Sequence, residues 1–212
     1  HLLQPRKRRT LTISATPAFV ARRLVPLVAD FHTQHSDLDL RLHASTTPVN
    51  FSTQQIDAAI RYGHGHYPGL HSECLLHTQY APLCSPRLGL RKPAELNRQP
   101  LLHYIWQASL ANPPDWPAWA RKAGLDALDF QHGVTFSDET HAIAAAIAGQ
   151  GVALLNTCLV ADELAQGSLV QPFGPSLDGF AYYLVYPAAT APDPALEALR
   201  AWLRDTVSNA SS

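Results

Sequence analysis

Alternating apolar and polar positions predict several strands in the first part of the chain. Residues 10–15 (TLTISA) alternate and are rich in β-branched side chains, and residues 37–45 place leucine at every second position. Such a period of two is typical of β-strands, and the run at 57–63 fits the same pattern. With a helix between the first two strands, this spacing predicts a βαβ unit and a parallel sheet.

A helical period of apolar positions follows the first strand. Thr16 suits the N-cap of this helix, and Pro17 suits its first position, where the missing N–H is not needed. Pro26 lies inside the pattern and should bend the helix. The expected apolar face comprises Val20, Leu24, Leu27, Val28 and Phe31.

A strand is expected at 72–85, and a second alternation of strand and helix patterns begins after the Pro-rich passage that follows it. Strands are expected there at 101–106, 130–136, 152–156 and 180–187. Helices are expected at 115–124, 137–151 and 157–167. These elements predict a second α/β lobe over 86–183. A final amphipathic helix follows, with an apolar face of Leu196, Leu199, Trp202, Leu203 and Thr206.

Composition and charge narrow the class of protein. The chain has 212 residues, of which 46% are apolar, and a formal net charge of −1. This suits a globular protein, but it supplies no overall basic field for nucleic acid and no polybasic membrane anchor. Three widely spaced cysteines favour a reducing compartment, and no apolar run approaches the roughly 20 residues that span a bilayer. We therefore expect a cytoplasmic protein.

The chain contains no methionine, which indicates a translational start upstream of His1. We expect residues 1–9, with the basic run PRKRR, to be the remnant of a linker between domains. A solvated charged linker explains this run better than a contact with nucleic acid does.

Segment 61–77 (RYGHGHYPGLHSECLLH) is rich in possible metal ligands. If its second half is a strand, His71 and His77 lie roughly 20 Å apart, and Cys74 points to the opposite face. Only His64 and His66 could pair flexibly with another ligand, whereas a closed zinc site usually has four ligands. We therefore predict no metal here. We expect the rim of a ligand pocket, with His64 and His66 as secondary contacts or pH-sensitive gates.

Sequence signatures of catalysis or of a bound cofactor are absent. There is no GxSxG nucleophile motif and no phosphate loop ending in GKS or GKT, and GHGHYPG lacks a following helix. Cys158 begins a helical pattern, but its apolar neighbours fit a buried structural cysteine better than a nucleophile. We therefore expect neither an enzyme nor a cofactor.

Helix starts and strand-end aromatics favour a binding protein instead. Helix N-termini at Thr16 and at 137–138 present N–H groups that suit a carboxylate or another anionic small molecule. A plain capping role is the alternative for each of these positions. Because open parallel sheets bind ligands at the carboxyl ends of their strands, two facing lobes predict a ligand cleft. The aromatic residues that could wall it, or could belong to the core instead, are Tyr62, Tyr104, Trp106 and Phe136.

Four stretches of the chain carry a resemblance to a known family. They are LTISATPAFVARRLVPLVADFHTQHSDLDLRL, VNFSTQQIDAAIRYGHGHYPGLHSECLL, PLCSPRL and FSDETHAIAAAIAGQGVALLN. Together they resemble the effector-binding domain of LysR-type transcriptional regulators, in the branch of the glycine-cleavage activator and the β-lactamase regulator. The likeness covers residues 10–205, and the combination of these motifs is more specific than any one of them.

The resemblance implies an α/β fold of the type II periplasmic-binding-protein-like class. Two Rossmann-like lobes are joined by two crossing strands, with a ligand cleft between the lobes. The final helix returns to lobe I, which then comprises 10–85 plus 184–212, while lobe II comprises 86–183. An N-terminal winged helix-turn-helix, absent from this chain, would make all contacts with DNA. Effector domains of this family form homodimers, lobe I against lobe II, within a homotetramer.

The resemblance also implies which residues contact the effector. They are Ala15, Thr16, Pro17, Thr46, Thr47, Asn50, Tyr62, Tyr104, Phe136, Ser137 and Asn156. The β-lactamase regulators often carry an acidic residue where this chain has Asn50, so the same muropeptide effector is not assumed. The expected function is an allosteric sensor that transmits ligand occupancy to the DNA-binding domain. A periplasmic solute-binding protein of a transporter, with a similar two-lobed architecture, is the alternative.

Overall fold

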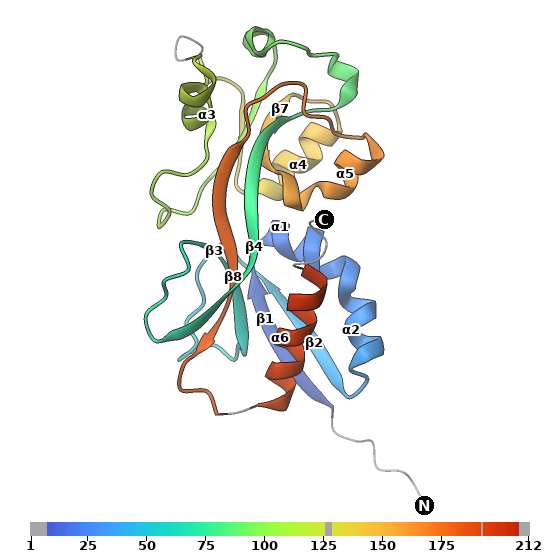
Figure 1. Ribbon diagram of the computed structural model, residues 1–212, viewed down its shortest axis with the longest axis vertical. Coiled ribbons are helices and arrows are strands. Elements are labelled where there is room, and N and C mark those ends of the chain that lie inside the picture. The colour runs from blue at the N-terminus through green and yellow to red at the C-terminus, as the bar shows by residue number, and fades with distance from the viewer. Residues whose placement is uncertain (1–7, 126–128, 192, 208–212) are drawn as a thin grey trace, which may run out of the picture. The chain divides into compact units, whose positions relative to one another are not determined.

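The computed structural model describes residues 8–125, 129–191 and 193–207, and these divide into two compact units (Figure 1). Unit 1 comprises the described residues up to Leu76 and from Ala181 onward, and unit 2 comprises His77–Phe180. Strands β4 (Leu70–Leu83) and β8 (Leu177–Pro187) each run from one unit into the other. The expected boundary after 85 lies just beyond β4 and the one after 183 lies inside β8, whereas the two units divide after Leu76 and after Phe180.

The sheet of unit 1 has the order β2-β1-β3-β8-β4. Strand β1 (Arg9–Ala15) pairs in parallel with β2 (Leu38–Ala44) and with β3 (Ala58–Gly63), as the spacing of the sequence patterns predicts. Strand β8 runs antiparallel to β3. The carboxyl ends of the three parallel strands therefore lie at one edge of this sheet. Of the expected linker, residues 1–7 lie outside the described part, while Arg9 already belongs to β1.

The expected single helix after β1 is instead a series of short segments. These are α1 (Pro17–Phe19), a π-helical turn (Val20–Leu24), a 3-10 turn (Val25–Leu27) and α2 (Val28–Gln34). Pro26 has no N–H to donate, and π and 3-10 turns change the number of residues per turn. The apolar face therefore rotates along the segment, which buries Phe31 but leaves Val28 38% exposed.

Helix α6 (Pro194–Val207) belongs to unit 1, where it lies beside β1 (Figure 1). Its buried residues include Leu196, Leu199, Trp202 and Leu203 from the expected apolar face. Glu73 of β4 accepts hydrogen bonds from Arg204 at 2.7 Å and from Arg200 at 3.1 Å. Burial alone would raise the pKa of Glu73, but these bonds outweigh it and lower the pKa. These ion pairs add charged contacts between α6 and β4, while the buried apolar face of α6 packs it on unit 1.

The sheet of unit 2 has the order β4-β7-β5-β6. Strand β5 (Leu101–Tyr104) pairs in parallel with β6 (Val134–Phe136) and with β7 (Val152–Asn156), whereas β4 is antiparallel to β7. The helices of this unit are α3 (Trp116–Ala123), α4 (Glu139–Ile147) and α5 (Ala161–Gln166). The carboxyl ends of β5, β6 and β7 share one edge, where α4 begins. In the described ranges, no helix is long and apolar enough to cross a membrane.

Several elements of unit 2 are shorter than the sequence pattern predicts, and the strand expected at 101–106 already ends at Tyr104. The strand expected at 130–136 begins only at Val134, because Gly133 has a positive φ of 122° that breaks the extended run. The helix expected at 137–151 begins after Asp138, whose carboxylate accepts a bond from the Thr140 backbone N–H. The helix expected at 157–167 is split into a 3-10 turn (Thr157–Leu159) and α5, and Val160 between them is not helical.

Candidate functional site

Three expected effector residues lie where β1 ends at the carboxyl edge of unit 1. Ala15 closes the strand, Thr16 is the N-cap, and Pro17 begins α1. The Thr16 carbonyl accepts the Val20 N–H at 3.0 Å, but the Thr16 side chain makes no capping bond. Thr16 therefore caps through its backbone alone, and its half-buried hydroxyl is not committed to the helix.

The loop after β2 carries three more expected residues, Thr46, Thr47 and Asn50, and all three are exposed. The Ser45 N–H donates to the Ala15 carbonyl at 2.9 Å, which fastens the start of this loop to the end of β1. The Asn50 Oδ1 accepts the Ser52 N–H at 2.9 Å. The side-chain oxygen of Asn50 is thus committed to a local turn, so its amide nitrogen is the group that it can offer to a ligand.

Tyr62, near the end of β3, lies in the core of unit 1. Its ring centroid is 5.0 Å from that of Tyr182, which in turn is 4.4 Å from Phe19, and Tyr62 is only 7% exposed. Of the two roles expected for aromatic residues at strand ends, a place in the core therefore describes Tyr62 better than a place in the wall of an open pocket. An effector could reach only the small exposed part of this side chain.

Arg61 of β3 contacts aromatic rings from the loops on either side of this strand. The Arg61 guanidinium lies over the rings of Tyr67 and Phe51, at 5.3 and 5.9 Å, and donates to the Val49 carbonyl at 2.9 Å. Burial lowers the pKa of Arg61, and the nearby Tyr67 opposes this. His64 and His66 are exposed on the loop between Arg61 and Tyr67. A role for these two histidines at a ligand stays a prediction.

The carboxyl edge of unit 2 brings the other expected residues together. Tyr104 and Phe136 are paired neighbours at the ends of β5 and β6, and Asn156 ends β7 next to them in the sheet. Ser137 is exposed, and the following residue, Asp138, is the N-cap of α4. Within this unit, residues far apart in the sequence therefore meet where a helix begins, as parallel sheets favour.

Asn156 has an incompletely satisfied side chain at this edge. It is fully buried, and its Oδ1 accepts the Cys158 N–H at 3.1 Å. Its Nδ2 is also buried and has no hydrogen-bond partner among the described residues. A buried donor without an acceptor is uncommon, because leaving it unpaired costs about 1–3 kcal/mol.

Glu139 is a further polar residue of this edge, and the sequence interpretation missed it. Its carboxylate accepts the Asn156 N–H at 3.2 Å, and its side chain is buried at the start of α4. Burial raises the pKa of Glu139 to about 7, although hydrogen bonds from Asn156 and Tyr104 partly oppose this. The sequence did hold one signal for Glu139: it is an acidic residue directly after the N-cap of a helix, and that helix begins just after an expected strand.

The pKa of Glu139 predicts a pH-dependent stability. Because this carboxyl binds its proton more tightly when folded, its stabilising effect is full below its ordinary pKa of 4.5 and is lost as the pH rises through about 7. Glu139→Gln should remove this dependence, which we expect to be on the order of 2–3 kcal/mol between about pH 5 and about pH 8. Urea unfolding at the two pH values measures it. Asp162→Asn, an exposed carboxyl of the same unit, should keep the wild-type dependence.

Each of the two edges offers hydrogen-bonding groups suited to holding a small polar molecule. Unit 2 contributes the Asn156 amide as a donor and the Glu139 carboxyl as either donor or acceptor near neutral pH. Unit 1 contributes the Thr16 hydroxyl and the Asn50 amide nitrogen. A few well-placed polar groups of this kind are typical of sites that orient a ligand.

Comparisons with known proteins agree with this arrangement. The glycine cleavage system transcriptional activator of Escherichia coli (strain K12) is 35% identical over 199 residues, which are 91% of this chain and 63% of the activator. The HTH-type transcriptional activator AmpR of Pseudomonas aeruginosa is 31% identical over 92% of this chain and 65% of its own length. The chain thus spans a little under two thirds of these relatives. Their role as transcriptional activators does not favour a transporter component.

Solved structures show the same fold. The effector domain of the transcriptional regulator AmpR of Pseudomonas aeruginosa matches with a TM-score of 0.79 and 30% identity, over 94% of this chain and 96% of that one. The AmpR effector binding domain of Citrobacter freundii matches with a TM-score of 0.80 and 25% identity, over 95% and 100% of the two chains. The family model described as the LysR substrate binding domain matches residues 4–208. This chain therefore belongs to the LysR substrate binding domain family.

Proposed function

We propose that this chain senses a small-molecule effector for a LysR-type transcriptional regulator and performs no catalysis. The observation that carries the proposal is the polar cluster at the carboxyl edge of unit 2, where the buried Asn156 amide nitrogen has no partner among the described residues. An effector with a hydrogen-bond acceptor would satisfy this nitrogen. The family membership supports effector sensing as the role of such a cluster.

The effector would act by shifting a conformational equilibrium. A ligand favours one arrangement of the protein only to the extent that it binds that arrangement more tightly than the other. The relatives are longer than this chain, so we expect DNA contacts from an N-terminal helix-turn-helix outside it. A shift in the effector domains would change the spacing of the DNA-reading helices within a cytoplasmic tetramer.

The chemistry of the unit 2 edge bears on which effectors fit. The N-terminus of α4 and the Asn156 amide favour an acceptor such as a carboxylate. Ionised Glu139 would repel that carboxylate, whereas protonated Glu139 could donate to it. Because the pKa of Glu139 is about 7, binding of an anionic effector should strengthen as the pH falls below neutral.

A thermal-shift screen with amino acids, aromatic acids and peptidoglycan fragments tests the proposal. We expect one class of compound to stabilise the protein saturably, by RT ln(1 + [L]/Kd), or about 2.7 kcal/mol at a hundredfold excess over Kd. The double variant Thr16→Ala, Ser137→Ala should weaken this binding at least about tenfold, which is the loss of one good hydrogen bond. The double variant Ser72→Ala, Ser109→Ala, at one exposed serine of each unit, serves as the control. Equal binding by both double variants would contradict the site assignment.

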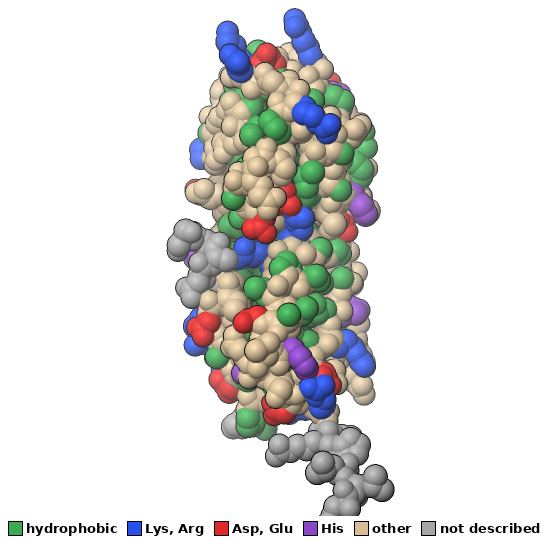
Figure 2. All heavy atoms as spheres, turned by 90° about the vertical axis from the view of Figure 1, so that its right-hand side faces the viewer, with side chains coloured by type: hydrophobic (Ala, Val, Ile, Leu, Met, Phe, Trp, Pro, Cys, Tyr) green, Lys and Arg blue, Asp and Glu red, His purple; other side chains and the backbone are tan. Residues whose placement is uncertain are grey.

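Self-association is also expected, and unit 1 has a surface that suits it. Figure 2 shows hydrophobic side chains gathered on the face of unit 1 that carries α2, where Val25 and Val28 are 51% and 38% exposed. Exposed apolar patches on a small domain often mark a surface that a partner covers. We propose that this face contacts unit 2 of a second copy in a head-to-tail homodimer.

A further inference from the structure

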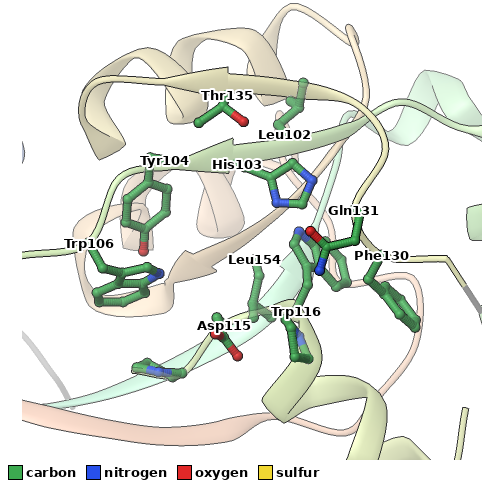
Figure 3. A pocket seen from close by; sticks show the side chains of 12 residues that line it. Leu102, His103, Tyr104, Trp106, Asp115, Trp116, Phe130, Gln131, Thr135 and Leu154 are labelled. Carbon is green, nitrogen blue, oxygen red and sulfur yellow. The ribbon is translucent and has the colours of Figure 1, made fainter. Parts of the chain in front are cut away.

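Unit 2 contains a cavity that is separate from most of the expected effector residues. Its volume is about 270 Å³, and it lies between the sheet and the start of α3 (Figure 3). Of the expected effector residues that the structure describes, only Tyr104 lines it. Its polar and aromatic lining includes His103, Trp106, Asp115, Trp116 and Gln131. Such a volume suits a ligand smaller than a typical drug molecule.

Asp115 brings a carboxylate to the wall of this cavity. Its Oδ1 accepts the Ala118 N–H at 2.8 Å and so caps α3, which commits one carboxylate oxygen. In Figure 3, Asp115 lies between Trp106 and Trp116. The faces of aromatic rings attract cations, so these rings and the carboxylate favour a positively charged ligand.

Trp116 adds an unsatisfied donor to the cavity wall. The residue is only 3% exposed, and its Nε1 has no hydrogen-bond partner among the described residues. Its ring is stacked on Phe130 at 5.8 Å and lies edge-on to Trp119 at 5.5 Å. These two ring contacts hold the indole in place. In Figure 3, Trp116 lies beside the exposed Gln131 side chain, which a ligand could displace.

His103 supplies an acceptor to the same cavity. Its Nε2 lies 3.0 Å from the His132 carbonyl, and a carbonyl can only accept, so Nε2 carries the proton. In the neutral ring, Nδ1 is therefore an acceptor. The cavity thus combines one carboxylate, one imidazole acceptor, aromatic walls and one buried donor that lacks a partner in the described part of the chain.

We propose that this cavity is a second ligand site, which binds a small organic cation that also carries a hydrogen-bond acceptor. The cationic nitrogen pairs with Asp115 and lies against the aromatic rings, while the acceptor meets the Trp116 N–H. The site lies wholly within unit 2 and does not depend on the effector proposed above. A regulator with such a site can respond to a second chemical signal.

Three probe molecules of similar size test separately whether the cavity recognises the positive charge and whether it recognises the hydrogen-bond acceptor. Picolylamine (aminomethylpyridine) carries both the cation and the acceptor, benzylamine carries the cation alone, and benzyl alcohol carries no charge. Binding is measured by calorimetry, and the Trp116 indole signal is followed in ¹H–¹⁵N correlation spectra. We expect picolylamine to bind more tightly than benzylamine, benzyl alcohol to bind at least about tenfold more weakly than either amine, and the Trp116 signal to shift with picolylamine.

Two variants assign the binding to these residues. Asp115→Asn should weaken both amines at least about tenfold, while it preserves the helix cap because the asparagine oxygen accepts the same bond. Trp116→Phe should reduce the affinity for picolylamine to that for benzylamine. Asp162→Asn is the control and should bind like the wild type. The proposal is overturned if benzyl alcohol binds as tightly as the amines, if no amine saturates the wild-type protein, or if Asp115→Asn leaves amine binding unchanged.

Discussion

Gly133→Ala is expected to destabilise unit 2 strongly. Gly133 precedes β6 with a φ of +122°, a conformation that residues with a side chain rarely adopt. A Cβ at this position would overlap the Leu101 carbonyl oxygen and would lie 2.8 Å from the Leu101 carbonyl carbon. Both are backbone atoms of β5, so no side-chain rotation can relieve the clash. The strand pairing of β5 with β6 would have to separate.

The expected cost of this change exceeds about 4 kcal/mol, because a forced φ and a backbone clash act together. That is a large part of the 5–15 kcal/mol or so that typically stabilises a domain. Urea unfolding followed by tryptophan fluorescence and circular dichroism measures it. Gly124→Ala is the matched control, since Gly124 also has a positive φ, of +68°, but no atom lies within 4 Å of the added Cβ. We expect it to cost about 1 kcal/mol. Equal losses in the two variants would disprove the clash.

Trp202→Ala is expected to destabilise unit 1 by about 3–5 kcal/mol, the usual cost of removing a buried aromatic side chain. Trp202 is 2% exposed, and its ring lies edge-on to Phe31 at 5.0 Å. Its Nε1 also donates to the Asp30 carboxylate at 2.9 Å. The variant therefore leaves a cavity between α6 and α2 and removes a hydrogen-bond partner of Asp30.

Comparison with Trp202→Phe separates these two effects. Phenylalanine keeps the aromatic contact with Phe31 but cannot donate to Asp30, so an intermediate loss of about 1–2 kcal/mol is expected. Arg204→Ala, on the exposed face of the same helix, should cost no more than about 1 kcal/mol. Chemical denaturation of the three variants measures the order of their losses in unfolding free energy. If Trp202→Ala unfolds with the same midpoint as Arg204→Ala, α6 does not anchor unit 1 through this tryptophan.

Much of the candidate site was predictable from the sequence. It depends on apolar periodicity and helix capping, which are local, and on the rule that parallel strands end at the same edge of a sheet. The strand at 10–15, the cap positions before the helices and the parallel pairing all follow from periodicity and spacing in the sequence. Parallel strands place their carboxyl ends at one edge, so Tyr62, Tyr104 and Phe136 could be singled out near the ends of expected strands, and Thr16 at a helix start. Family resemblance supplied Asn156 and the loop residues of unit 1, and the contacts of all these residues with an effector stay predictions.

Other features were not predictable because they depend on approaches between distant parts of the chain. The pKa of Glu139 rises because α4 buries this residue beside β7, and a sequence does not show that burial. Tyr62 belongs to the core because Tyr182 of β8 packs on it. The strand expected at 130–136 is cut short by the positive φ of Gly133, which lies against the Leu101 backbone of β5.

The sequence by itself determined the class of fold, the family and the edges of the two sheets where a ligand is expected. The fold class and the edges follow from the period of apolar positions, the spacing of the elements and the residues at turns, all of which act over short stretches of chain. The family follows from motifs that can be read in the sequence itself. Only the tertiary structure decided which polar groups at those edges are buried without a partner in the described part of the chain, and that a cavity beside α3 holds Asp115 and the Trp116 N–H, which lacks a partner there too. Burial and hydrogen-bond pairing are set by segments that meet only on folding, so no local pattern encodes them.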